Sequence, residues 1–490
     1  MSLAVARRRA VSLLAMSLVL PGTAQLVAGH RGIGRLVLRV WLGLLAVVAL
    51  LGAIAYLSLS TVVGLVSAPW FLAVAQWLLY AWAAIWALVL IDAWRLGRPA
   101  SQPTRTRRRF AIATVVLLLA PAGVAYAGAS VSAGRAALGE VFGGGPTVPP
   151  VDGRYNILLM GGDSGEGREG TRPDSLQLVS IDADTGRAVT FGFARDTENI
   201  VFERGSVMAG LMPEGWTCGD ECLLNGLYTW AWDHRDEFPA GTEDPGILAT
   251  REAVEALSGL EVQYHALVDM NGFRSLIDAL GGLEITVMRR TPIGGGTSPI
   301  FDHIEAGRQR LDGYHALWYA RSREGSTNYE RMARQRCVMS AMVDQVDPRT
   351  LALRFGEIAS ASTGVLTTDI PQSELGNFAE LALKTRAQKI TGVNFVPPLI
   401  KPWNFEQAEM HRIVDQTIEA SEDTAQEEAV STSAKPLPTP GATAPAPAVP
   451  TPETKATADG EADPAYDPLA KPSEDAFAKT DDIASVCSVG

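Results

Sequence analysis

The order of apolar and polar positions divides this chain into an apolar first part, a mixed middle part and a polar end. Three apolar runs are long enough for membrane-spanning helices, at about residues 40–59, 71–91 and 110–127. An earlier apolar segment, residues 11–28, is broken by Pro21-Gly22 and by the polar Gln25. We therefore predict three transmembrane helices, and we interpret residues 11–28 as an interfacial or re-entrant hairpin rather than a fourth span.

The middle part has the shorter periods of a folded α/β domain. Apolar or alternating runs predict strands at residues 156–160, 175–181, 187–193, 266–270 and 283–287. Helical patterns lie near residues 247–257 and 272–280, and Gly281-Gly282 is a helix stop signal. This mixture predicts one central mixed sheet with helices on its faces.

Composition sets the expected boundaries between these parts. A Gly/Pro-rich segment precedes the first strand, and the chain after about residue 420 is rich in Ala, Pro, Thr and acidic residues. We predict a membrane region at 1–135, a linker at 136–153, a folded domain at 154–420, a disordered spacer at 421–481 and a docked C-terminal segment at 482–490.

The arginines predict the orientation of the membrane helices. The first 150 residues contain thirteen arginines and two acids, whereas the rest contains 29 basic and 52 acidic residues. Six arginines precede the first apolar run, six lie between the second and the third, and residues 60–70 carry no charge. Because cytoplasmic loops are rich in Lys and Arg, we expect a multi-pass cell-membrane protein with its folded domain extracellular. The acidic character of that domain argues against nucleic acid as a partner.

Four cysteines fit an oxidising, extracellular compartment. Three pairings are open from the sequence alone. We favour Cys218–Cys222 because the two residues are close in the chain, which leaves Cys337–Cys487 to fix the tail to the domain. A zinc site is the alternative, but no histidine spacing supports it.

A cluster of arginines is the main candidate for chemistry. A short helix is expected from Asp312 toward Trp318, followed by an extended segment in which Arg321 and Arg323 point the same way. A second helix beginning at Asn328 would place three further polar residues on one face: Arg331, Arg334 and Gln335. Planar guanidinium groups match phosphate oxygens, so this clustering indicates a pyrophosphate-sized anion rather than only a solvated basic face.

A second group of charged residues is expected at one edge of the sheet. If the first three strands form an antiparallel meander, its members come together: Asp163, Arg172, Asp174, Arg195 and Asp196. Carboxylates beside arginines can hold Mg²⁺ next to a pyrophosphate, whereas the simpler interpretation is a set of loop salt bridges. The glycines at 165, 167 and 170 match a dinucleotide-binding spacing, but Pro173 and a strand follow where that motif needs a helix.

Seven short motifs occur in a characteristic order. They are Asn156-Ile-Leu-Leu-Met-Gly-Gly-Asp-Ser164, Thr171-Arg-Pro-Asp-Ser-Leu-Gln-Leu-Val179, Phe193-Ala-Arg-Asp-Thr197, Leu224-Asn-Gly-Leu-Tyr228, Val268-Asp-Met-Asn-Gly-Phe273, Asp278-Ala-Leu-Gly-Gly-Leu-Glu-Ile-Thr-Val287 and the segment from Leu311 to Gln335. Over roughly residues 154–345 the chain resembles the LytR–CpsA–Psr (LCP) family of Gram-positive cell envelopes.

The resemblance implies a Mg²⁺-dependent phosphotransferase that moves an anionic glycopolymer from undecaprenyl pyrophosphate to peptidoglycan. It implies an α/β fold with a hydrophobic tunnel for the polyprenyl chain, a phosphodiester product and the release of undecaprenyl phosphate. Carried over by position, the metal ligands are Asp163 and Asp174, and Asp196 orients Arg195. The pyrophosphate contacts are Arg172, Arg195, Arg321, Arg323, Arg331, Arg334 and Gln335.

Some positions depart from the family pattern. Pro173, Gly192, Ala194 and Asn328 stand where the family usually has other residues, and three spans replace the usual single one. Asp174 or Asp196 is the candidate general base. Two other functions are open, a polyprenyl-pyrophosphate hydrolase and a non-catalytic lipid-binding scaffold. The polymer is also open, whether teichoic acid, arabinogalactan or capsule.

Overall fold

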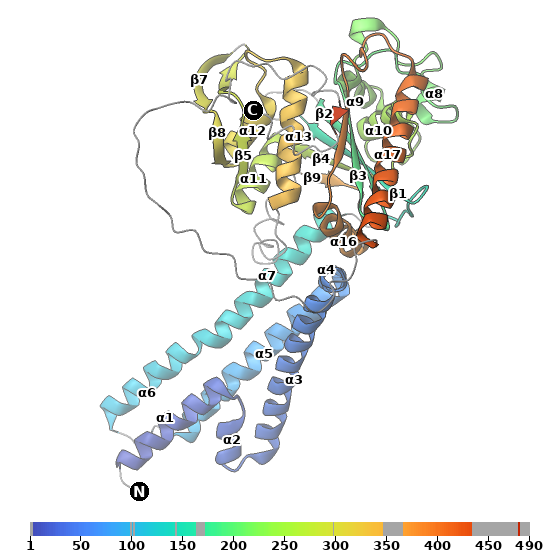
Figure 1. Ribbon diagram of the computed structural model, residues 1–490. Helices are drawn as coiled ribbons and strands as arrows, with labels where there is room; N and C mark the ends of the chain where they lie inside the picture. Colours follow the sequence, from blue (N-terminus) through green and yellow to red (C-terminus); the bar gives the residue numbers. More distant parts are fainter. Residues whose placement is uncertain are drawn as a thin grey trace, which may run out of the picture. The chain divides into compact units, whose positions relative to one another are not determined.

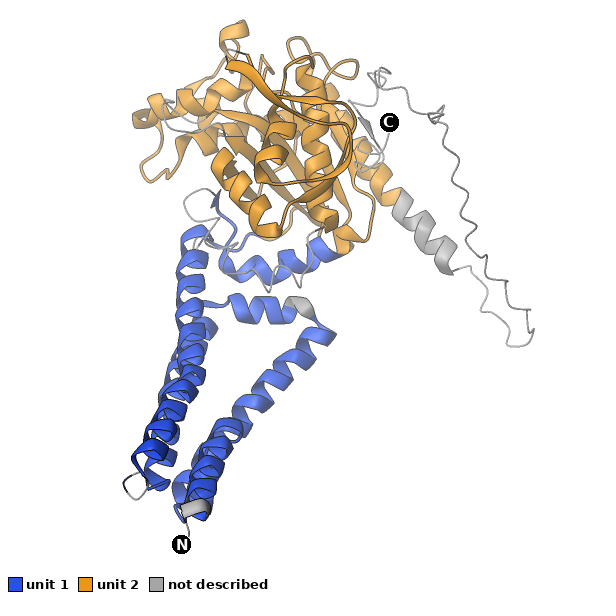
Figure 2. Ribbon diagram, turned by 90° about the vertical axis from the view of Figure 1, so that its left-hand side faces the viewer, with its two compact units in different colours: residues 1–148, 347–383 blue, residues 149–346, 384–490 orange. Residues whose placement is uncertain are grey.

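The computed structural model describes residues 3–98, 100, 103–142, 145–162, 172–296, 298–345, 366–433 and 479–480. It divides into two compact units (Figure 2). Unit 1 comprises residues 1–148 and 347–383, and unit 2 comprises residues 149–346 and 384–490. The limits that we predicted for the linker and for the acidic spacer remain predictions.

Unit 1 is largely helical (Figure 1). Its helices are α1 (Leu3–Val19), α2 (Thr23–Val27), α3 (Arg31–Leu57), α4 (Leu59–Ser67), α5 (Pro69–Leu96), α6 (Thr104–Leu117) and α7 (Leu119–Val141). The later segment of the unit contains β9 (Leu366–Thr368), the short helix η4 (Gln372–Glu374) and most of α16 (Leu375–Arg386). Three helical stretches are long and apolar enough to cross a membrane: 31–57, 69–96 and 104–141. They contain the three runs that the hydrophobic pattern predicted, apart from the last two residues of the first run.

The segment 11–28 forms most of α1 and α2, with a break at Pro21-Gly22. Gly22 has φ +97°, and a Cβ there would lie 2.6 Å from the carbonyl oxygen of Gly34 in α3. Gln25 is buried, and its Nε2 donates to Asp92 Oδ2 at 3.1 Å and to the Val89 carbonyl at 3.2 Å. The NH₂ group of the polar residue that interrupts this apolar segment therefore finds both of its acceptors on α5.

Unit 2 is built on a mixed sheet. Its strands are β1 (Arg154–Gly162), β2 (Pro173–Asp182), β3 (Ala188–Phe193), β4 (Tyr264–Asp269), β10 (Thr391–Phe395) and β11 (Lys479–Thr480). Within unit 2 they are ordered β11-β10-β3-β2-β1-β4. The pairs β1–β2, β2–β3 and β10–β11 are antiparallel, whereas β1–β4 and β3–β10 are parallel. The predicted meander and the predicted mixed sheet are both confirmed.

One face of this sheet is covered by the larger apolar core of unit 2. Alternate residues of the strands, such as Leu158, Leu178 and Phe191, point into it because side chains alternate across a strand. The covering helices are α8 (Val207–Leu211), α9 (Leu224–Asp233), α10 (Pro245–Ser258) and α17 (Gln407–Ser433). Figure 1 shows α10 and α17 on this side of the sheet.

The opposite side of the sheet carries a second apolar cluster. It is built by α11 (Met270–Leu280), α12 (Gly313–Arg321) and α13 (Asn328–Gln345) with two hairpin-like sheets. One sheet pairs β5 (Leu283–Val287) with β8 (Gly307–Leu311), and the other pairs β6 (Thr291–Gly295) with β7 (Ser298–Ile304). Gly281, with φ +89°, ends α11 as the sequence predicted.

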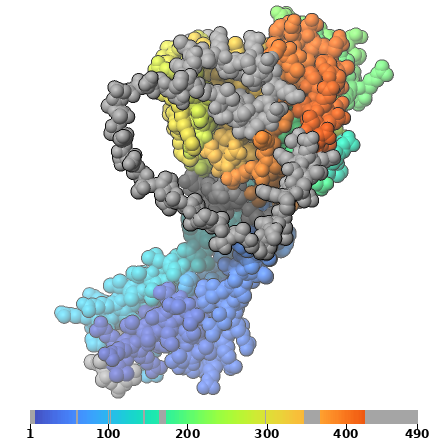
Figure 3. Space-filling view, viewed as in Figure 1, coloured from blue at the N-terminus to red at the C-terminus, as the bar shows by residue number. Residues whose placement is uncertain are grey.

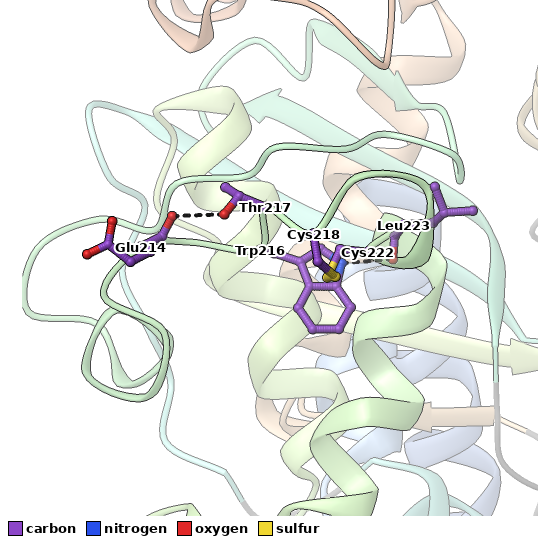
Figure 4. Close-up of a disulfide and its surroundings, with 6 residues drawn as sticks. All are labelled: Glu214, Trp216, Thr217, Cys218, Cys222 and Leu223. Atoms are coloured by element: carbon purple, nitrogen blue, oxygen red, sulfur yellow. Dashed lines mark hydrogen bonds between the residues drawn. A yellow bond between two sulfur atoms is a disulfide. The ribbon is translucent and has the colours of Figure 1, made fainter.

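A disulfide closes a tight loop before α9 (Figure 4). Cys218 and Cys222 flank the short helix η2 (Gly219–Glu221), and their Cα atoms are 5.1 Å apart. Figure 4 shows the Trp216 ring beside this bond, and its Nε1 donates to the Leu223 carbonyl at 3.1 Å. This confirms the first predicted disulfide. Cys337 is buried and is not a free thiol, but its predicted partner Cys487 lies outside the described residues.

Candidate functional site

The centre of the candidate site is an ion pair between the start of β2 and the end of β3. Leu176 of β2 pairs with Phe193 of β3, so the residues just beyond them meet at one edge of the sheet. Arg195 Nη1 donates to Asp174 Oδ1 at 2.7 Å, and 27% of each side chain is exposed. The predicted convergence of these two residues is confirmed.

Asn225 is a third member that sequence reasoning did not assign. It is the second residue of α9, it is 5% exposed, and its Nδ2 donates to Asp174 Oδ1 at 3.2 Å. Its backbone N–H donates to the Arg195 carbonyl at 3.0 Å, which fixes the start of α9 against the end of β3. The motif at 224–228 was the available signal, but nothing in the spacing showed that its asparagine reaches Asp174.

The orientation of the Asn225 amide follows from its partner. A carboxylate only accepts hydrogen bonds, so the NH₂ group must face Asp174 and Oδ1 must point away. That oxygen is buried and has no hydrogen-bond partner among the described residues. A buried acceptor without a donor is costly, so this oxygen is available to a ligand donor or a cation.

Helix α13 adds Arg331 and Gln335 to the same edge. Arg331 is 3% exposed, and its Nη2 donates to the Asp174 carbonyl at 2.9 Å. One turn later, Gln335 Oε1 accepts from Ser175 Oγ at 3.2 Å. These two residues are four apart, so they share one face of the helix, and that face meets the start of β2.

The start of α13 is determined locally. Thr327 N donates to Glu330 Oε2 at 2.7 Å, and Glu330 N donates to Thr327 Oγ1 at 3.1 Å. This reciprocal pair is a capping box, which satisfies two backbone groups at a helix start. The predicted beginning of the helix at Asn328 is confirmed, and the box fixes the register that brings Arg331 to Asp174.

The charges in this cluster shift one another's pKa values. Burial raises the pKa of Asp174, but the hydrogen bond and charge of Arg195, the charge of Arg331 and the Asn225 hydrogen bond together lower it below 3.8. Burial lowers the pKa of Arg331 to about 10, opposed by Asp174 and reinforced by the charges of Arg195 and Arg323. Asp174 is therefore ionised at neutral pH. The charges of Arg195 and Arg323 both act on the buried Arg331.

The helix before this loop ends later than predicted. Asp312 caps α12, as expected, because its Oδ1 accepts from His315 N at 2.9 Å. The helix does not stop near Trp318 but continues to Arg321, since Tyr-Ala-Arg contains no stop signal. Arg321 is thus helical rather than extended, and its guanidinium carbon lies 5.4 Å from the centroid of the Trp318 ring. Arg323 follows in the exposed loop.

Arg334 is occupied with the end of α12. Its Nε donates to the Tyr319 carbonyl at 2.8 Å, and its Nη2 donates to the Ser322 carbonyl and to Ser326 Oγ. Helix carbonyls at a C-terminus need such donors. Burial lowers the pKa of this arginine. Its contact with an anion remains a prediction, while the contacts that it makes join α12 to α13.

Asp196, the residue after Arg195, binds the first residue of α13. Its Oδ1 accepts from Asn328 Nδ2 at 3.2 Å, so the asparagine that departs from the family pattern binds a member of the predicted site. Burial and the Asp196 charge both raise the pKa of Tyr329, which places that tyrosine close to the carboxylate.

Arg172 and Asp163 are the remaining predicted members of the site. Arg172 is exposed at the start of β2. Asp163 lies in the segment 163–171, outside the described residues, together with the glycines of the loop. The described residues contain no group of three His, Cys, Asp or Glu side chains that could hold a metal ion. The Mg²⁺ pair of Asp163 and Asp174 therefore remains a prediction.

The arrangement of these side chains defines a class of site. A mixed α/β domain presents a carboxylate with lowered pKa, several arginines and an unpartnered amide oxygen at one sheet edge. Such a set suits a ligand with several phosphate oxygens.

The chain belongs to the LytR_cpsA_psr family, whose model matches residues 141–419. Among curated proteins it is 25% identical over 307 residues to the cell wall biosynthesis protein LcpA of Corynebacterium glutamicum, covering 57% of this chain and 56% of that protein. It is 22% identical over 222 residues to a polyisoprenyl-teichoic acid–peptidoglycan teichoic acid transferase, TagU, of Bacillus mycoides, covering 45% of this chain and 62% of that protein. It is 25% identical over 225 residues to the regulatory protein MsrR of Staphylococcus aureus, covering 45% and 58%. The matches thus cover less than two thirds of each of these relatives.

Solved structures of similar proteins include TagV of Bacillus subtilis, with 19% identity, a TM-score of 0.39, and coverage of 56% of this chain and 98% of that chain. A structure of TagT bound to LIIa-WTA has 16% identity, a TM-score of 0.37, and coverage of 55% and 92%.

Proposed function

We propose that this protein transfers an anionic glycopolymer from a polyprenyl-pyrophosphate carrier to peptidoglycan. The observation that carries the proposal is that Arg195 and Arg331 both bind Asp174 at one sheet edge, while the charge of Arg323 acts on Arg331. Like charges held close together repel one another, so a polyanion that bridges the guanidinium groups is favoured. Family membership and the named activity of the Bacillus relative support the same reaction class.

The proposed chemistry is a displacement at phosphorus. A hydroxyl group of peptidoglycan attacks the phosphorus atom next to the polymer, a new P–O bond forms, and the bond to the bridging oxygen breaks. Polyprenyl phosphate leaves with the bond electrons, and the hydroxyl proton passes to a base. The arginines stabilise the negative charge that develops on the phosphoryl oxygens.

The candidate general base is Asp196 rather than Asp174. Asp174 already accepts hydrogen bonds from Arg195 and Asn225, and its lowered pKa makes it a weak base. Asp196 accepts a hydrogen bond from Asn328 and is half-buried, next to Arg195 in the chain.

The described residues offer suitable oxygens for Mg²⁺. The hydrogen bonds from Arg195 and Asn225 both reach Oδ1 of Asp174, and the buried Asn225 Oδ1 has no donor among the described residues. Hard cations prefer such oxygen ligands. We propose that Asp174, Asn225 and Asp163 would hold the ion, which would supply additional charge neutralisation at the phosphates.

The membrane part of the proposal follows from the apolar helices and the arginine pattern. We propose a multi-pass protein whose unit 2 is extracellular, where both peptidoglycan and the carrier's head group are found. A hydrophobic tunnel beside the sheet for the polyprenyl chain is part of the same proposal.

The test is a double substitution, Arg321→Ala with Arg323→Ala, in the full-length protein. We expect loss of polymer attachment by a factor of 100 or more, since several phosphate contacts would be removed together. The matched control is Arg308→Ala with Arg310→Ala on β8, because both arginines are exposed and pair with Glu284 and nearby carbonyls. We expect that variant to retain activity.

The same assay separates the other two functions. A hydrolase would release polymer phosphate at the same rate with and without peptidoglycan. A non-catalytic lipid-binding scaffold would leave attachment unchanged in the Arg321/Arg323 variant while circular dichroism shows a folded chain. Either result would contradict the proposed transfer.

A further inference from the structure

A short hairpin formed by β6 and β7 is tied to the loop that carries Arg323. Ser322 Oγ donates to the Pro292 carbonyl at 2.8 Å, and Gly296 N donates to Glu324 Oε2 at 3.2 Å. Arg289 Nη2 also donates to the Gly325 carbonyl at 3.0 Å. Three hydrogen bonds therefore hold this hairpin in a fixed position beside the arginines.

The hairpin exposes apolar side chains on β7. Phe301 is 60% exposed and Ile300 is 44% exposed, although both are large and apolar. In the space-filling view the yellow residues of the β7–β8 region form part of the surface of unit 2 (Figure 3). A single exposed apolar residue needs no explanation, but an exposed aromatic ring next to a charged site can be functional.

The Phe301 ring is connected to Arg321 through the ring of Trp318. It makes an edge-to-face contact with Trp318, with 6.0 Å between the ring centroids. The same Trp318 ring carries the Arg321 guanidinium at 5.4 Å. Phe301 and Arg321 thus both contact the same indole ring.

The backbone of the hairpin has a conformation at Gly294 that favours glycine. Gly294 has φ +103°, a conformation that side chains disfavour. A Cβ at Gly294 would lie 3.1 Å from Phe301 Cδ1 and 2.3 Å from the Pro299 carbonyl oxygen. The turn that presents the Phe301 ring therefore requires glycine at this place.

We propose that Phe301 and Trp318 form a platform for the sugar that is attached to the pyrophosphate of the donor lipid. This inference rests on the proposed function and adds the sugar as a second part of the donor that the site would bind. The C–H face of a sugar ring is apolar, and aromatic rings bind it through dispersion and weak C–H contacts. The sugar is joined to the phosphate through one oxygen, so an anion on Arg321 brings that sugar to the Trp318–Phe301 pair.

The surroundings favour a sugar over a membrane or a protein. Among the described residues of this hairpin, Ile300 and Phe301 are the exposed large apolar side chains, and the acidic Asp302 follows at once. Nearby, Arg290 and Glu305 form an exposed ion pair at 3.0 Å. Membrane-surface segments need a broad apolar face with basic residues, and stable protein interfaces need a much larger area. The peptidoglycan acceptor has no covalent link that would hold its ring beside Arg321.

The test compares two lipids with the full-length protein in detergent. The probes are a polyprenyl pyrophosphate and the same lipid bearing one N-acetylglucosamine. For Phe301→Ala we expect the Kd of the sugar-bearing lipid to rise about 5- to 10-fold, as loss of an aromatic contact implies. The Kd of the sugar-free lipid should stay unchanged. Phe301→Tyr should retain binding, and Trp232→Ala, an exposed aromatic change on α9, should have no effect.

Three results would overturn the platform. An equal loss for both lipids would indicate a contact with the lipid or the membrane. Unchanged binding of both lipids with a higher KM for peptidoglycan would assign the ring to the acceptor. Unchanged binding and unchanged transfer would leave Phe301 without a role. The Arg321/Arg323 double variant separately tests binding of the sugar-free lipid, so failure of the proposed function would be recognised independently of Phe301.

Discussion

At the scale of single residues, Asp174 is where the site is assembled. Its carboxylate accepts from Arg195 and Asn225, and its carbonyl accepts from Arg331. The partners come from the end of β3, the start of α9 and the first turn of α13. One residue thus receives donors from three separate elements, and its ionisation influences them all.

Asp174 should make stability depend on pH. Its pKa is lowered in the folded protein, so its contribution is present above the ordinary carboxyl pKa and is lost as the pH falls through the lowered value. We expect the ionised group to contribute on the order of 1 kcal/mol. The measurement is urea unfolding between pH 7 and pH 3 for the wild type and for Asp174→Asn.

The stability difference between the two proteins should be largest near neutral pH and should shrink below about pH 4. A difference that is constant over this range would show that the charge of Asp174 is not responsible. Activity of the variant should be measured in parallel, because the proposed metal and phosphate contacts depend on the same carboxylate.

At the scale of elements, α12 and α13 act as a pair joined by Arg334. This side chain belongs to α13 but donates to Tyr319, the third-last residue of α12, and to Ser322 just after it. The loop between the helices carries Arg323 and contacts the β6–β7 hairpin. The position of the loop that carries Arg323 therefore depends on Arg334, which contacts the end of α12.

Replacement of Arg334 by Ala should destabilise unit 2 by about 2–3 kcal/mol, because the carbonyls at the end of α12 would lose a charged donor. Arg334→Lys should restore only part of this, since one ammonium group cannot reproduce the planar fork. Thermal unfolding followed by tryptophan fluorescence would measure both effects. Arg308→Ala, which removes an exposed ion pair, is the control, and an equally small change in both proteins would contradict the helix-pairing role.

The sequence predicted those elements whose signals are local. The meander follows from three apolar runs and one turn, and the cap at Asp312 follows from a side chain that binds its own helix. The contact of Asn225 with Asp174 spans 51 residues, and that of Arg331 with Asp174 spans 157. Contacts of this kind depend on packing of distant elements, for which a single sequence carries no local signal.

Two further details show the same limit. The end of α12 was placed too early because Tyr319, Ala320 and Arg321 carry no helix signal of their own beyond ordinary propensity. Gly192 was recognised only as a departure from a family pattern. In the fold, a Cβ at Gly192 would lie 2.1 Å from Asn394 Oδ1, so glycine makes room for a residue of the neighbouring parallel strand.

At the scale of the whole molecule, an apolar basic part is followed by an acidic folded part. The arginine clusters near residues 7–39 and 95–109 predict that both lie on the cytoplasmic side. Reporter fusions would test this orientation in cells. A phosphatase that is active only outside the cytoplasm should be active when fused after residue 150 and inactive when fused at residue 103.

Replacing the arginines at 105, 107, 108 and 109 with glutamine should weaken this preference, and replacing exposed arginines of unit 2 such as Arg308 should not. Activity of the fusion at residue 103 in the otherwise unchanged chain would contradict the predicted topology.

The hydrogen bonds that Arg195, Asn225 and Arg331 donate to Asp174 have a consequence for biogenesis. Residues 174, 195 and 225 emerge early in synthesis, but the guanidinium that binds the Asp174 carbonyl is supplied by residue 331. A nascent chain therefore carries an incomplete centre until α13 has left the export channel and docked. Lipid carrier encountered before that moment would meet only part of the binding surface, so maturation of the centre is coupled to completion of the polypeptide.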